Sequence, residues 1–224
     1  MGKTELSHLM KILKILIAVL SVFLSIGFGI TLAEMILPFD FNPPSIRYFL
    51  AGFGIFIPLW FTWLKNKHFY STFEHELTHL LVGLLFFKKP AHFTVTRDAG
   101  GETGLYGGNF LITLAPYFLP TFSFLMLPVY LIILPKFHLH YFILFGFVVA
   151  YHVFSTIQEF SYSQPDIIMS GKIFSTLFLV FTNILVYGFL IVFVIGGFEH
   201  GGIFLKQGFL ESANWLIELI SNFI

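Results

Sequence analysis

The chain contains no cysteine among its 224 residues, which excludes disulfides, thiolate metal ligands and a cysteine nucleophile. Charge is scarce as well, since 11% of the residues are Asp, Glu, Lys or Arg, whereas a soluble domain usually carries about 25%. The 12 basic residues are matched by 12 acidic ones and form no basic stripe, so we expect no nucleic-acid partner. Any metal bound by this chain must therefore be held by His, Asp or Glu.

Hydrophobic residues make up 57% of the chain, and a chain of this composition needs the lipid bilayer as its solvent. A helix crosses the roughly 30 Å hydrocarbon layer with about 20 residues. Apolar runs of about this length occupy residues 12–37, 46–64, 70–87, 109–134, 138–158 and 167–195. Because lipid leaves backbone groups without partners and the runs lack the alternation of a barrel strand, they should be helices. We predict an all-α polytopic membrane protein with about six transmembrane helices, forming one domain over residues 1–224 in a bacterial-type cell membrane.

The two ends of the chain differ from the other runs. Lys3, Lys11 and Lys14 precede the run 12–37, as in a signal peptide, but this run is too long for a signal sequence and no cleavage site follows promptly. We interpret it as a retained transmembrane helix. Residues 203–224 mix apolar and polar side chains, which favours an amphipathic helix that lies in the membrane interface.

The fourth run and the connection before it also depart from a plain helical pattern. Pro116, Pro120 and Pro128 each remove a helical hydrogen bond, which predicts a kinked or partly unwound helix unless the prolines are simply tolerated. The connection at 88–108 contains a segment of strand composition, 91–96, followed by a glycine-rich turn. This pattern predicts a β-hairpin against the membrane.

The third run carries the sequence His-Glu-Leu-Thr-His at residues 75–79. Residues four apart share one face of a helix, so His75 and His79 can offer two imidazole nitrogens to one tetrahedral zinc ion (Zn²⁺). Glu76 is then placed to act as the general base toward a water on the metal. Ionisable side chains inside a membrane helix cost a few kcal/mol each, which argues against chance. The motif predicts a zinc hydrolase.

A catalytic zinc site of this kind needs a third protein ligand. The chain has three aspartates, Asp40, Asp98 and Asp166. Counting membrane crossings places Asp166 at the membrane face where the helix of His79 ends, whereas Asp40 belongs to the opposite face and Asp98 to the glycine-rich turn. We therefore predict Asp166 as the third ligand.

A polar stripe on the fifth run offers alternatives. His152, Thr156 and Glu159 follow helical spacing and end close to Asp166. They form either a hydrogen-bonded seam between helices or a face turned toward the metal. In the second case Glu159 or His152 would replace Asp166 as the ligand.

The motif at 75–79, the predicted hairpin at 91–106 and Pro165-Asp166, in this order, resemble the site-2 protease family of intramembrane zinc metallopeptidases. The resemblance implies an intramembrane zinc metalloprotease with His75, His79 and Asp166 as ligands and Glu76 as the base. The family has an Asn eight residues before its Asp, which stabilises the charged intermediate; Gln158 has that spacing here. The chain lacks the Asn and Gly that flank the family's Asp.

The resemblance also implies a substrate, namely a transmembrane segment or a remnant signal peptide that unwinds near the zinc. The strand edge at 93–96 would pair with the substrate backbone, unless the hairpin is only structural. Two other functions remain open. One is a polytopic zinc peptidase of another type with Glu159 as ligand, and the other is a metal-binding membrane protein or transporter without catalysis. The basic residues do not assign the orientation in the membrane.

Overall fold

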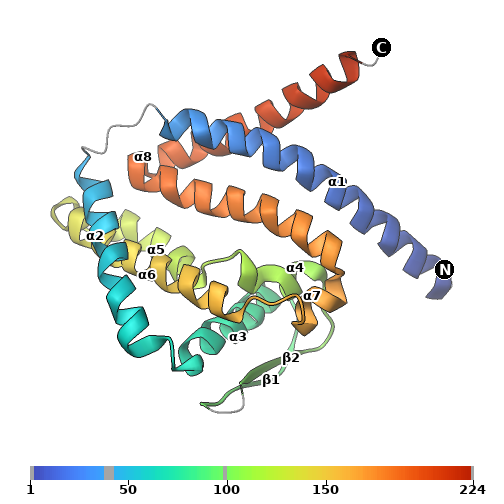
Figure 1. The fold of residues 1–224 in the computed structure, drawn as a ribbon, viewed down its shortest axis with the longest axis horizontal. Helices are drawn as coiled ribbons and strands as arrows, with labels where there is room; N and C mark the ends of the chain where they lie inside the picture. The colour runs from blue at the N-terminus through green and yellow to red at the C-terminus, as the bar shows by residue number, and fades with distance from the viewer. Residues whose placement is uncertain (1–2, 38–42, 98–99, 223–224) are drawn as a thin grey trace. The chain divides into compact units, whose positions relative to one another are not determined.

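The computed structural model describes residues 3–37, 43–97 and 100–222, and it is mainly helical (Figure 1). About 81% of the chain is helix, and a two-stranded sheet completes it. Two of the aspartates considered as ligands, Asp40 and Asp98, lie outside the described residues.

Several helices are long and apolar enough to cross a membrane. Within the described ranges these are His8–Ile36, Pro44–Leu64, Pro135–Glu159 and Lys172–Ser221, with a fifth if the bent pair Phe110–Tyr117 and Thr121–Ile132 counts as one span. The helices are therefore compatible with an all-α membrane protein, whereas six crossings stay a prediction. Contacts divide the chain into two compact units, Met1–Asp40 with Ser170–Ile224, and Phe41–Met169. The single membrane domain also stays a prediction.

The first unit pairs α1 (Lys3–Ile36) with α8 (Lys172–Ser221). Phe28 of α1 contacts the rings of Phe181 and Phe204 at centroid distances of 5.8 and 5.3 Å. Those two partners lie on either side of a kink in α8 at Gly196 and Gly197, where Gly197 has a φ of 68°. The kink separates the predicted span 167–195 from the predicted amphipathic helix 203–224.

In the second unit, α2 (Pro44–Leu59) runs into a π-helical turn, η1 (Trp60–Leu64), and packs against α6 (His138–Glu159). The two backbones touch at two glycines. A Cβ atom on Gly52 would lie 1.8 Å from the carbonyl oxygen of Ile143, and one on Gly146 would lie 2.0 Å from that of Phe49. Small residues allow this close packing of membrane helices.

Replacing Gly52 by Ala should therefore destabilise the second unit, because the added methyl group must push α2 away from α6. We expect a loss of about 1–3 kcal/mol in the free energy of unfolding, typical of overpacking. Gly54→Ala on the same helix is the matched control, since a Cβ there meets nothing within 4 Å. Equal thermal stability of the two variants in detergent would contradict the observed contact.

The helix of the metal motif, α3 (His68–Leu85), packs against α6 and a β-hairpin (Figure 1). The hairpin consists of antiparallel β1 (Pro90–Val95) and β2 (Gly101–Leu105), which confirms the prediction for 88–108. Asp98 and Ala99, between the two strands in the sequence, lie outside the described residues. α3 itself is not among the candidate spans within the described ranges, because its polar residues lower its hydropathy.

The fourth predicted run is broken rather than continuous. α4 (Phe110–Leu114) and the short η2 (Ala115–Tyr117) precede α5 (Thr121–Ile132), and the two halves meet at 82°. Pro116 lies in η2 and Pro120 is the N-cap residue of α5, whereas Pro128 lies inside α5. The predicted kink is therefore confirmed at the first two prolines, and the third is tolerated within a helix.

A short turn, η3 (Pro135–Phe137), leads into α6, and α7 (Pro165–Ser170) follows it. α7 ends at Ser170, and the next residue, Gly171, has a φ of 96°, in the left-handed region that glycine adopts most readily. The predicted span beginning at residue 167 is thus corrected, because α8 begins at Lys172 after this break.

Candidate metal centre

α3 presents the two motif histidines on one face, as their spacing predicts. Their ring centroids are 4.9 Å apart, and the Nε2 atoms of His75 and His79 are separated by 3.2 Å. Both side chains are mostly buried, with 13% and 12% of their surface exposed. The nitrogens therefore converge on one point in a largely desolvated place.

Asp166 completes this group from α7. Its Oδ2 atom lies 3.2 Å from His75 Nε2 and 3.3 Å from His79 Nε2. Pro165 begins α7, a position where its missing N–H costs no hydrogen bond, and this places Asp166 in the first turn. The structure thus brings the three predicted ligands together.

The three donor atoms have the spacing of a metal site. Donors held about 2.0–2.1 Å from one tetrahedral zinc ion lie about 3.3–3.4 Å from each other. The three separations observed here are 3.2, 3.2 and 3.3 Å. Two imidazoles and one carboxylate are also a ligand set that zinc commonly takes. His75, His79 and Asp166 could therefore hold a metal ion.

A backbone hydrogen bond orients the ring of His79 for metal binding. Its Nδ1 atom lies 2.9 Å from the carbonyl oxygen of Ile112, which can only accept, so Nδ1 carries the proton. In the neutral ring this leaves a lone pair on Nε2, the atom that faces His75 and Asp166. An outer partner of this kind orients most metal-binding histidines.

Asp166 is held as an anion. Burial disfavours its charged form, but when the Nε2 atoms of His75 and His79 carry protons, their hydrogen bonds outweigh burial and keep the pKa of the carboxyl well below its usual range. A negative oxygen facing two imidazole nitrogens attracts a cation. The charge distribution therefore agrees with the geometry.

The predicted base, Glu76, is buried beneath the hairpin. The hydroxyl of Thr103 in β2 donates to the backbone carbonyl of Glu76 at 3.0 Å. Gly101 leaves room for the Glu76 side chain, since a Cβ on Gly101 would lie 2.6 Å from Glu76 Cγ. The hairpin thus covers the motif helix beside its carboxylate and limits access of water.

A tyrosine that the sequence reasoning missed lies in contact with the cluster. The hydroxyl of Tyr117 donates to Asp166 Oδ2 at 3.2 Å, and its ring meets the ring of His75 edge-on at 5.2 Å. Tyr117 ends η2, at the break in the fourth segment. The prolines at 116 and 120 predicted the break, but no spacing rule connects Tyr117 with the motif.

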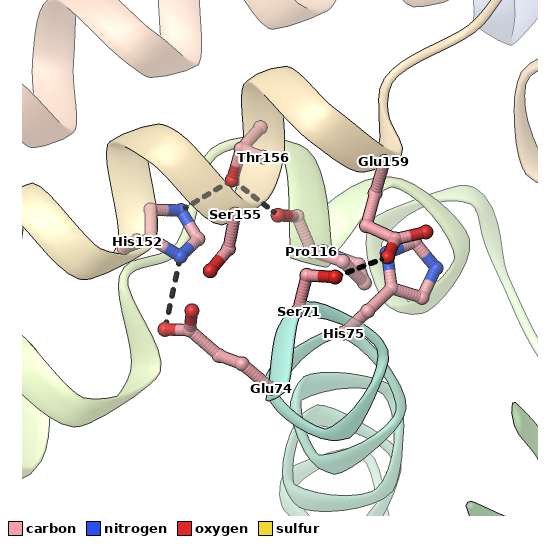
Figure 2. Close-up of a pocket in the computed structure, with 8 residues that line it drawn as sticks. All are labelled: Ser71, Glu74, His75, Pro116, His152, Ser155, Thr156 and Glu159. Carbon is pink, nitrogen blue, oxygen red and sulfur yellow. Dashed lines mark hydrogen bonds and ion pairs between the residues drawn. The ribbon is translucent and has the colours of Figure 1, made fainter. Parts of the chain in front are cut away.

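The polar stripe of α6 faces α3 beside His75, where the two helices line a small cavity (Figure 2). His152 Nδ1 lies 3.0 Å from Glu74 Oε1 in a fully buried pair. Glu74 Oε2 has no hydrogen-bond partner among the described residues, and Figure 2 shows the Ser155 hydroxyl directed toward it. The cavity has a volume of about 10 Å³ for water. This is about enough for one bridging water molecule.

Glu159, the other alternative ligand, has partners on α3 as well. Its carboxylate accepts hydrogen bonds from Ser71 at 2.6 Å and Thr72 at 3.2 Å. Together with the pair of His152 and Glu74, these contacts form a hydrogen-bonded seam between α3 and α6. Neither Glu159 nor His152 belongs to the group of three converging donors found in the described part of the chain.

Gln158 is placed differently from the other predicted site residues. Its amide nitrogen lies 2.7 Å from Nδ1 of His68, the first residue of α3. His68 precedes His75 by about two helical turns. The structure therefore does not bring Gln158 into the cluster of converging donors, and its role toward an oxyanion stays a prediction.

Comparisons with known proteins returned no match. No protein-family model matches the chain, no curated protein matches it, and no solved structure matches it. The resemblance to the site-2 protease family accordingly rests on the motif residues and their order alone.

Proposed function

We propose that the chain is an intramembrane zinc metalloprotease that hydrolyses a peptide bond within or near a transmembrane segment. The observation that carries this proposal is the convergence of His75, His79 and Asp166 at 3.2–3.3 Å, with Glu76 next to one ligand on the same helix. Helices apolar enough to cross a membrane support the location. We further propose six crossings in a bacterial-type cell membrane.

The chemistry divides between the metal and the chain. A bound zinc ion supplies Lewis acidity, which favours attack by water on the scissile carbonyl. The carboxylate of Glu76 takes a proton from the attacking water while the oxygen of that water bonds to the carbonyl carbon. As the C–N bond breaks, Glu76 delivers that proton to the leaving amine. His75, His79 and Asp166 hold the metal in place during both steps.

The hairpin supports a mode of substrate binding. β1 pairs with β2 on one side only within the described residues, and its side chains are largely exposed. A substrate segment unwound from a transmembrane helix or remnant signal peptide would add as a strand along 93–96. Main-chain hydrogen bonds would then hold it in extended form near Glu76, with little demand on its sequence.

Metal removal tests the proposal directly. The purified protein is reconstituted in liposomes with a single-span membrane protein, and products are identified by mass spectrometry. We expect cleavage that stops after treatment with a zinc chelator and returns when one equivalent of zinc is added. Cleavage that continues in metal-free protein would refute the zinc mechanism. Stoichiometric zinc without cleavage of any single-span or signal-peptide substrate would favour a non-catalytic metal protein.

A zinc peptidase with Glu159 as the third ligand is the competing assignment. The structure favours Asp166, because the Glu159 carboxylate is engaged by Ser71 and Thr72 and lies outside the converging group. The zinc affinities of the Asp166→Ala and Glu159→Gln variants distinguish the two assignments.

A further inference from the structure

Tyr117 occupies a position beside the converging donors that neither the motif nor the proposed general base explains. Its hydroxyl donates to Oδ2 of Asp166, the same oxygen that faces His75 and His79. The O–O distance of 3.2 Å is close to the 3.2–3.3 Å separations among the three ligand atoms. The hydroxyl therefore lies beside the point on which the donor atoms converge.

The tyrosine is also fixed in place. Its ring lies edge-on to His75 on one side at 5.2 Å and edge-on to Phe160 on another at 5.7 Å. Only 2% of its surface is exposed. A hydroxyl on a buried ring that is held in place stabilises developing charge more strongly than one in water, because only its O–H bond has to rotate toward the new acceptor.

The hydroxyl reaches the site from the break in the fourth segment. Tyr117 ends η2, which contains Pro116, and lies just before the 82° bend that leads into α5. The broken segment thus contributes a side chain to the cluster, as α3 and α7 do.

We propose that the hydroxyl of Tyr117 is a catalytic hydrogen-bond donor that stabilises the negative charge developing on the carbonyl oxygen of the scissile peptide. This inference rests on the proposed protease function. On substrate binding the hydroxyl turns from Asp166 Oδ2, which then serves the metal, toward the carbonyl oxygen. The hydroxyl thus fills the role that the resemblance to the site-2 protease family implies for Gln158, whose amide is directed to His68.

Tyr117→Phe tests this role, since it removes one oxygen atom and leaves the ring contacts with His75 and Phe160. We expect kcat to fall about 10²–10³-fold, as for loss of one oxyanion donor, with KM and zinc affinity within about 2-fold of wild type. A phosphinic peptide inhibitor, whose anionic oxygen mimics the charged carbonyl oxygen, should lose affinity by a similar factor. Zinc affinity is measured by competition with a chromogenic chelator.

The rival role for Tyr117 is to position Asp166 as a ligand. In that case Tyr117→Phe would lower zinc affinity about 10–100-fold, and kcat would recover at saturating zinc; this outcome overturns the proposal. A second variant, Tyr117→Gln, restores a neutral donor and should exceed the Phe variant in kcat. Equal kcat values for the Phe and Gln variants would also count against a donor role.

Tyr141→Phe is the matched control. Tyr141 is similarly buried, and its hydroxyl donates to the backbone carbonyl of Met126 at 3.1 Å, away from the cluster. It should lose stability but keep kcat and inhibitor affinity. If wild-type protein cleaves in a zinc-dependent manner and Tyr117→Phe is unchanged, only this inference fails. If wild-type protein does not cleave, the proposed function itself fails.

Discussion

Replacing Glu76 by Gln should lower cleavage of a single-span substrate about 10²–10⁴-fold, the contribution that a positioned general acid or base usually makes. The amide has nearly the same shape as the carboxylate, so the packing beside Gly101 and the hydrogen bond from Thr103 should persist. It cannot take a proton from water, however. Zinc content should therefore stay at one ion per chain while turnover is lost.

The measurement is the initial rate of substrate cleavage in liposomes, together with the zinc content of the same sample. Glu102→Gln is a suitable control, because Glu102 also belongs to the hairpin region but its side chain is 77% exposed. We expect it to keep wild-type turnover. Unchanged cleavage after Glu76→Gln would exclude Glu76 as the base and with it the proposed mechanism. Loss of both zinc and turnover would instead assign Glu76 to metal binding.

Replacing Asp166 by Ala should remove the metal and all zinc-dependent cleavage. The variant takes away one of three converging donors and leaves His75 and His79 facing each other across 3.2 Å. Loss of an outer partner of a ligand already costs about 10–100-fold in affinity, so loss of the ligand itself should exceed that range. Zinc affinity measured by chelator competition checks the prediction, and thermal unfolding confirms that the variant is folded.

Glu159→Gln provides the comparison, because Glu159 is the competing third ligand. Its amide keeps an oxygen that can accept from Ser71 and Thr72. We expect this variant to bind zinc as tightly as wild type. The reverse pattern, in which Asp166→Ala retains zinc and Glu159→Gln loses it, would transfer the site to the other type of zinc peptidase.

The sequence predicted those parts of the site that depend on local periodicity. His75 and His79 meet because four residues make about one helical turn, and the hairpin forms where strand composition meets a glycine-rich turn. Asp166 followed from counting membrane crossings, which needs only the order of the runs. These features have short-range or topological causes, so one sequence was sufficient to find them.

Other parts depend on tertiary packing and have no local signal. Tyr117 reaches Asp166 across 49 positions in the chain, and no local pattern in the sequence links the two residues. The pairing of His152 with Glu74 depends on the rotation of α6 about its axis. Sequence spacing identified the stripe that contains His152, but it left open whether that stripe faces the metal or α3.

Gln158 illustrates a limit of transferring a role by spacing. Eight residues before Asp166 is the distance that the resemblance demands, but the segment between them ends α6, turns, and begins α7. The orientation of Gln158 is set by α6 and that of Asp166 by α7. A fixed separation along the chain therefore does not fix the distance between these side chains.

The polar surroundings of α3 impose an order on the assembly of this protein. Its side chains find their partners far downstream: Thr78 meets Thr121 after 43 residues, Glu74 meets His152 after 78, and His75 meets Asp166 after 91. During synthesis α3 emerges before these partners exist. Its buried polar side chains can therefore be paired only after the chain has been made as far as α6 and α7, so α3 reaches its final packing late.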